Sequence, residues 1–77
     1  MIDRNPIIQR HLDEIEEGWH VVKPAGAGDI DVRCVVQKPS EYKEAYPNLP
    51  VRWFDDAQDE LIKRELRLAL SEAVVTK

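Results

Sequence analysis

Residues 19–38, WHVVKPAGAGDIDVRCVVQK, decide the fold of this chain because they place two apolar runs on either side of a small-residue turn. The segment AGAGD at 25–29 is typical of a hairpin turn, and the alternation that follows it is typical of a half-buried strand. A turn centred on Ala27 predicts an antiparallel hairpin. Its facing pairs are His20 with Cys34, Val22 with Val32, and Lys23 with Asp31. The last pair joins opposite charges beside an apolar ladder, so the pattern and the pairing agree.

The same alternation divides the predicted hairpin into two faces. One face is expected to enter the core, with His20 at its rim. It contains Val22, Ile30, Val32, Cys34 and Val36. The opposite face carries Trp19, Val21 and Val35, which predicts either a covering element or an exposed contact surface there.

An amphipathic helix is predicted on each side of the hairpin. Asn5 and Pro6 are a typical helix start, and Gly18 is a typical residue just after a helix end. The apolar stripe between them is formed by Ile8, Leu12 and Ile15, with Ile7 and His11 at its margin. A last helix is predicted over about 57–74. Its core stripe contains Ile62, Leu66, Ala69, Leu70 and Ala73.

The order of elements predicts an α+β fold in a single small domain of residues 1–77. Residues 40–45 are expected to form a short helical turn, and residues 51–54 a third strand. The simplest arrangement is a three-stranded antiparallel sheet with both terminal helices packed on one face. This order resembles the double-stranded RNA-binding domain, in which a basic cluster at the start of the last helix binds phosphates. Residues 55–60 here read DDAQDE, so the resemblance covers topology alone.

Length and cysteine content limit the class of protein. A chain of 77 residues buries only roughly 60–65% of the surface that its unfolded form exposes, which favours a homodimer or a bound partner. Cys34 is the only cysteine, so no disulfide is expected and a cytoplasmic location is favoured. The start MIDRN has no charged region followed by an apolar run, and no apolar stretch approaches the ~18 residues of a membrane span. We therefore expect a soluble protein without membrane contact.

The net charge of −4 comes mainly from the two ends of the chain. Nucleic-acid affinity depends largely on Lys and Arg that neutralise phosphates, so an acidic chain is an unfavourable ligand for DNA or RNA. A protein with a basic surface is the better partner. Within the first helix, Glu14, Glu16 and Glu17 are either a solvated face or an acidic docking patch.

A second apolar stripe on the last helix contains Leu61 and Leu68. These leucines either widen the buried face or pack against another chain. Tyr42 and Tyr46 stand among charged residues and are expected to be exposed, as interface aromatics often are.

Few residues could support catalysis. A facing His20 and Cys34 would be a nucleophile with a base, but no third group orients the histidine, and a thiol on the core face is expected to be structural. No Cys-x-x-Cys or His-x-x-x-His spacing is present, so no metal site or cofactor is predicted. An enzyme is therefore the third interpretation of this chain.

The sequence favours a non-catalytic small acidic protein that binds another protein, such as an inhibitor or immunity-type factor that occupies a basic site on a nucleic-acid enzyme. The alternative is a nucleic-acid-binding module that uses Lys23, Arg33 and Lys38 on the hairpin. The predicted partner-binding residues are Glu14, Glu16, Glu17, Trp19, Tyr42, Tyr46, Leu61 and Leu68.

Overall fold

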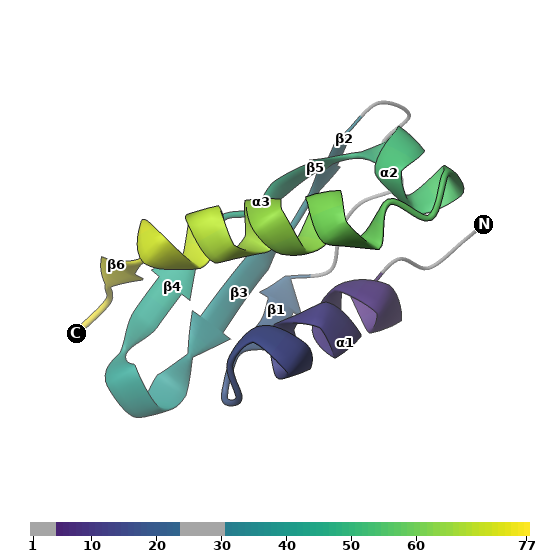
Figure 1. Ribbon diagram of the computed structural model, residues 1–77. Coiled ribbons are helices and arrows are strands. Elements are labelled where there is room, and N and C mark those ends of the chain that lie inside the picture. The colour runs from purple at the N-terminus through teal and green to yellow at the C-terminus, as the bar shows by residue number, and fades with distance from the viewer. Residues whose placement is uncertain (1–4, 24–30) are drawn as a thin grey trace.

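A computed structural model describes residues 5–23 and 31–77, and these residues form the predicted α+β fold (Figure 1). Helices stand near both ends of the chain, with short strands between them. The elements in chain order are α1 (Asn5–Ile15), β1 (His20–Lys23), β2 (Asp31–Arg33), β3 (Val35–Lys38), the 3-10 turn η1 (Pro39–Glu41), β4 (Lys43–Ala45), β5 (Asn48–Pro50), α2 (Val51–Asp55), α3 (Asp59–Ser71) and β6 (Val74–Val75).

The strands form two antiparallel sheets rather than the one three-stranded sheet that was expected. The larger sheet has the order β1-β3-β4-β6, and the smaller one pairs β2 with β5. The two long helices lie in front of the larger sheet, where α1 contacts β1 and α3 contacts β4 (Figure 1). They also contact each other, so the expected packing of the helices on one face is confirmed.

The predicted hairpin register is wrong. His20 stands opposite Gln37 and Val21 opposite Val36, because β1 pairs with β3 and not with β2. The expected single strand is interrupted at Cys34, whose backbone N–H donates to the Pro47 carbonyl oxygen at 3.3 Å. This contact separates β2 from β3, so the two halves join different sheets. The turn expected at 25–29 and the predicted burial of Ile30 depend on residues 24–30, which lie outside the described residues.

The register determines which side chains of β1 are buried, because neighbouring residues on a strand point to opposite faces. Val21 pairs with the buried Val36, and Val36 pairs in turn with the buried Ala45. Val22 therefore points away from the core and is 43% exposed, which contradicts its predicted burial. Trp19 precedes the strand and is only 1% exposed, so of the two alternatives for that face, a covering element or an exposed contact surface, Trp19 fits the covered one.

Two further elements differ from the prediction. Residues 51–54 fall in the one-turn helix α2 and not in a strand, because the extended Pro50 precedes them as the N-cap and β5 ends there. Residues 40–45 include only the end of the 3-10 turn, which stops where Tyr42 adopts a left-handed conformation with φ 54°. The strand β4 follows at Lys43, where a helical turn had been expected.

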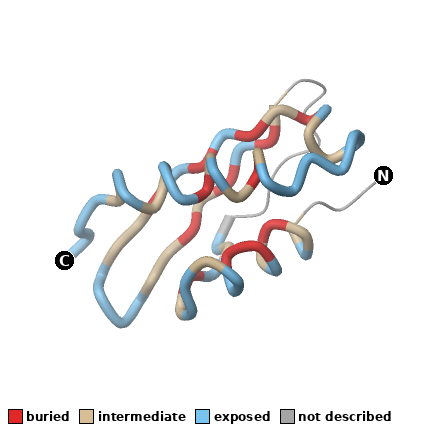
Figure 2. The backbone as a smooth tube through the Cα atoms, viewed as in Figure 1, coloured by how far each residue is buried: buried red, intermediate tan, exposed pale blue. Residues whose placement is uncertain are grey.

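The core lies between the helices and the sheets (Figure 2). The predicted apolar stripe of α1 supplies Ile8 and Leu12, and that of α3 supplies Ile62 and Leu66. The remaining buried apolar residues are Trp19, Val32, Cys34, Val36, Ala45, Leu49 and Val51. The helix bounds are shorter than predicted, since α1 ends at Ile15 and α3 begins at Asp59.

A side chain of α1 covers the outer edge of β1. The Gln9 Nε2 group donates to the Trp19 carbonyl oxygen at 2.8 Å, and the Val21 N–H donates to Gln9 Oε1 at 3.1 Å. The side-chain amide therefore makes both kinds of hydrogen bond that a neighbouring strand would make. This places β1 firmly against α1.

Candidate functional site

The acidic side chains predicted as a docking patch on α1 are mostly engaged inside the molecule. Glu14 Oε2 lies 2.9 Å from Lys63 Nζ on α3. Glu16 accepts a hydrogen bond from Trp19 Nε1 at 2.6 Å, and its other oxygen lies 3.1 Å from Lys38 Nζ. All three side chains are exposed, and Glu17 is the one member of the predicted trio that carries no ion pair within the described residues.

These contacts change the acidity of both carboxyl groups. Hydrogen bonds from Lys63 and then from His11 lower the pKa of Glu14 below its ordinary value of 4.5. Hydrogen bonds from Trp19 and then from Lys38 lower the pKa of Glu16 in the same way. Since a carboxyl group with a lowered pKa favours its ionised form in the folded state, both groups stabilise the fold above pH 4.5.

We expect this stabilisation to disappear in acid. The free energy of unfolding should fall as the pH drops below about 4.5 and through the lower pKa values of the folded protein. A Glu14→Gln, Glu16→Gln variant should be less stable at pH 7 and should lose less stability between pH 5 and about pH 2. Urea unfolding across that pH range measures both effects. Glu17→Gln is the control, and a pH dependence in the double variant as steep as in the unmodified protein would contradict the prediction.

The predicted aromatic residues Tyr42 and Tyr46 are exposed, at 50% and 59% respectively, as expected. Lys77 Nζ lies 4.6 Å from the centre of the Tyr42 ring. The Tyr46 hydroxyl donates to the Glu44 carboxylate, and this hydrogen bond raises the pKa of Tyr46. Tyr46 also borders a small hollow of about 150 Å³. The hollow is lined by Tyr46, Asn48, Glu65, Ala69 and Glu72.

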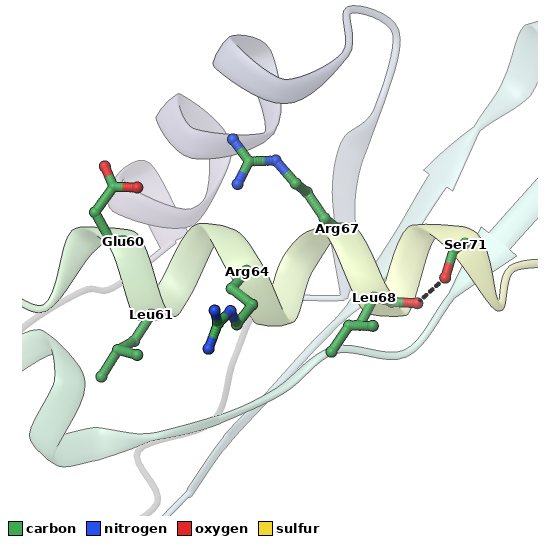
Figure 3. Close-up of a pocket in the computed structure, with 6 residues that line it drawn as sticks. All are labelled: Glu60, Leu61, Arg64, Arg67, Leu68 and Ser71. Carbon is green, nitrogen blue, oxygen red and sulfur yellow. Dashed lines mark hydrogen bonds between the residues drawn. The ribbon is translucent and has the colours of Figure 1, made fainter.

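The second apolar stripe lies on the solvent side of α3. Leu68 is 52% exposed and Leu61 is partly buried, so Leu68 does not widen the buried face. Both border an open hollow of about 620 Å³ (Figure 3). Its lining consists of Glu60, Leu61, Arg64, Arg67, Leu68 and Ser71. This surface, which we call the α3 face, combines exposed apolar atoms with charges of both signs, as protein contact surfaces do.

The predicted contact residues do not form one site. Trp19 is buried and is excluded from any contact surface. Leu61 and Leu68 share the α3 face, and the hollow beside Tyr46 includes Glu65 of α3 and Glu72, which directly follows that helix. Glu14 at the end of α1 and Glu16 just after it form ion pairs with Lys63 and Lys38 of the same chain.

A group of four exposed acidic residues was not predicted as a site. They lie where α2 leads into α3, and we call them the acidic corner: Asp55, Asp56, Asp59 and Glu60. Asp59 Oδ1 lies 3.4 Å from His11 Nε2, whereas Asp55 and Asp56 have no ion pair within residues 5–23 and 31–77. The acidic composition of residues 55–60 was the available signal, but it served only to set the chain apart from the double-stranded RNA-binding domain.

His11 was placed at the margin of the apolar stripe but is buried, with 1% exposure. Its Nδ1 lies 3.5 Å from Glu14 Oε2, and its Nε2 lies 3.4 Å from Asp59 without the geometry of a hydrogen bond. It follows Ile8 by three positions, which is helical spacing, so the sequence did carry the signal for its burial. His11 is thus buried between α1 and the start of α3, and its Nε2 has no hydrogen-bond partner among the described residues.

The possible catalytic pair does not assemble. The register places Gln37 opposite His20, and His20 is exposed while Cys34 is 5% exposed. Burial raises the pKa of the Cys34 thiol to about 11. Because the thiolate is the reactive form, this thiol is poorly suited to nucleophilic chemistry near neutral pH.

We expect Cys34 to react slowly with thiol reagents in the folded protein, at a rate that follows opening of the core. Cys34→Ala should lower the free energy of unfolding by about 1 kcal/mol because buried sulfur contacts are lost, and Cys34→Ser by somewhat more because a hydroxyl replaces the thiol. Labelling rates with and without denaturant, together with urea unfolding of both variants, measure these effects. Rapid labelling of the native protein would show that the thiol is accessible.

Two of the basic residues of the alternative interpretation, Arg33 and Lys38, lie in different sheets. Lys38 is 12% exposed at its side chain and forms ion pairs with Glu16 and Glu41. Arg33 lies in β2 of the smaller sheet, away from the pairing of β1 with β3. The side chain of Lys23 lies outside what the structure describes. The described residues therefore give no support to a basic hairpin surface.

Residues 5–23 and 31–77 contain neither a metal-binding cluster nor a membrane-spanning helix. No three His, Cys, Asp or Glu side chains there are grouped so that they could hold a metal ion. None of the helices described is both long enough and apolar enough to cross a membrane. No protein-family model matches this chain, and neither does any curated protein or solved structure.

Proposed function

We propose that this chain is a non-catalytic protein that acts by binding another protein with a basic surface. The observation that supports the proposal is the acidic corner, where Asp55 and Asp56 are exposed without an ion pair in the described part of the chain. By contrast, Glu14 and Glu16 already have cationic partners. Exposed carboxylates attract a complementary basic surface and speed the encounter with it.

The concrete form that we propose is a small acidic inhibitor or immunity-type factor in the cytoplasm that occupies a basic site on a nucleic-acid enzyme. The net charge of −4 supports this form, since such a factor replaces the phosphates that the site normally contacts. Nucleic acid itself is the less suitable ligand. Lys38, Lys43 and Lys63 all form ion pairs with glutamates of the same chain.

The experiment compares two variants of equal net charge. Asp55→Asn, Asp56→Asn neutralises the acidic corner, and Glu17→Gln, Glu72→Gln neutralises two exposed carboxylates elsewhere. Partners captured on the immobilised protein are identified by mass spectrometry, and each purified partner is then measured by surface plasmon resonance at several salt concentrations. The corner variant should associate more slowly than the control, and the difference should shrink as salt rises, because exposed charges are screened over about 8–10 Å.

Two results would contradict the proposal. If both variants bind the partner equally more weakly than the unmodified protein, net charge acts without a specific site. Salt-sensitive binding of labelled DNA or RNA that is lost in a Lys23→Ala, Arg33→Ala variant would support the nucleic-acid module instead.

A further inference from the structure

We propose that His11 forms a pH-dependent contact between α1 and α3, which stabilises the fold when the imidazole gains a proton. The two helices pack against each other (Figure 1). His11 belongs to α1 and is 1% exposed, although its polar ring would be well hydrated at the surface. Its position between the helices makes its protonation state part of the packing.

The two ring nitrogens face carboxylates on different helices. Nδ1 lies 3.5 Å from Glu14 Oε2 of α1, and Nε2 lies 3.4 Å from Asp59 Oδ1 at the start of α3. A neutral imidazole has a proton on only one nitrogen, and an ionised carboxylate only accepts hydrogen bonds. In either neutral tautomer, one nitrogen therefore presents a lone pair to a carboxylate oxygen. Only the imidazolium has a proton for each of the two contacts.

The charges around the ring favour the same form. Lys63 of α3 lies 2.9 Å from the Glu14 oxygen that faces His11. Glu14 and Asp59 are each negative and Lys63 is positive, so this group is neutral only when His11 is protonated. From β1, which also contacts α1, no side chain forms an ion pair with the ring within the described residues.

Burial opposes the charged form of the ring, because an ion loses hydration when it leaves water. The two carboxylates, however, are about half exposed, so they remain hydrated while they face the ring. Hydrogen bonds between ionised groups are about twice as strong as neutral ones. We therefore expect the two carboxylates to outweigh the burial of the ring.

The direction of the pH effect follows from this geometry. An imidazole in an unfolded chain gains its proton at about pH 6.5. A folded protein that retains this proton to a higher pH is stabilised below about pH 6.5, and the stabilisation is lost as the pH rises further. This range is separate from the acid range in which Glu14 and Glu16 lose their charges.

The test is urea unfolding of the protein at about pH 6 and about pH 8. The equilibrium constant for folding should be at least about threefold larger at the lower pH. His11→Gln should remove this difference, because glutamine gains no proton. The sequence has only one other histidine, the exposed His20, so His20→Gln is the matched control and should keep the difference.

Asp59→Asn tests the contact without changing the buried ring. Asparagine carries no charge that attracts the imidazolium, and its amide can donate to the lone pair of a neutral Nε2. The difference between the two pH values should therefore shrink. Glu60→Gln is the control, since both acids lie in the first turn of α3, where a negative charge stabilises the helix whatever the state of His11. If His11→Gln does not fold, this pair of variants decides the matter.

Nuclear magnetic resonance of the two histidines adds a direct measurement. At about pH 7, a larger fraction of His11 than of His20 should be protonated. The proposal is overturned if stability is equal at the two pH values, or lower at the more acidic one. It is also overturned if the pH dependence persists in both His11→Gln and Asp59→Asn.

This inference goes beyond the proposed function and does not depend on it. All of the measurements use the protein without a partner, and they probe stability and protonation rather than binding. The partner experiment uses Asp55 and Asp56, neither of which faces His11 in an ion pair within the described residues. The pH effect and the binding of a basic partner can thus succeed or fail separately.

Discussion

Trp19→Ala is expected to lower the free energy of unfolding by about 3–5 kcal/mol. The side chain is 1% exposed and is the largest in the core, so its removal leaves a cavity that the surrounding helix and sheet cannot fill completely. It also removes the Nε1 donor to Glu16. A domain is stable by only about 5–15 kcal/mol in total, so the variant should be largely or partly unfolded at 37 °C.

The measurement is urea unfolding followed by circular dichroism, because the substitution itself changes the fluorescence. Trp19→Phe keeps an aromatic ring, so its free energy of unfolding should fall by less than that of Trp19→Ala. Tyr46→Ala is the control for an exposed aromatic residue and should change stability by no more than about 0.5 kcal/mol. A Trp19→Ala variant as stable as Tyr46→Ala would show that Trp19 is accessible.

Leu66→Ala and Leu68→Ala should differ strongly although the residues are two positions apart on α3. Leu66 is fully buried, and its truncation should cost about 2–5 kcal/mol. Leu68 is 52% exposed, and its truncation should change the stability of the monomer by no more than about 0.5 kcal/mol. The contrast follows from the orientation of α3, which turns one side to the core and the other to solvent.

Both leucine variants should be unfolded with urea at a low protein concentration, so that self-association does not contribute to stability. Similar losses of monomer stability in the two variants would mean that Leu68 packs against the core after all.

The helices could be predicted from the sequence because their apolar stripes repeat between near neighbours in the chain. Ile8, Leu12, Ile62 and Leu66 are all buried as expected. The strands could not be paired correctly, because pairing depends on contacts distant in sequence. The hydrogen bond from Cys34 to Pro47 interrupts the expected strand, and no local pattern indicates it.

The candidate sites also divide into features that depend on near neighbours in the chain, which could be predicted, and features that depend on contacts distant in sequence, which could not. The exposure of Tyr42 and Tyr46 was predicted from their charged neighbours, whereas helical spacing left open whether Leu68 is buried or exposed. The ion pairs of Glu14 with Lys63 and of Glu16 with Lys38 join residues from different elements, so local charge patterns could not show that these acids are already neutralised. The surface available to a partner depends on such tertiary contacts.

The hydrogen bonds from the Gln9 side chain of α1 to the edge of β1 have a consequence for the protein in concentrated solution. Unpaired N–H and C=O groups on an outer strand are templates on which other chains can add strands, and this is a common start of aggregation. Gln9 occupies the carbonyl of Trp19 and the N–H of Val21, and the opposite outer strand, β6, has only two residues. The Gln9 side chain thus blocks the addition of a strand from another chain at these two backbone groups of β1.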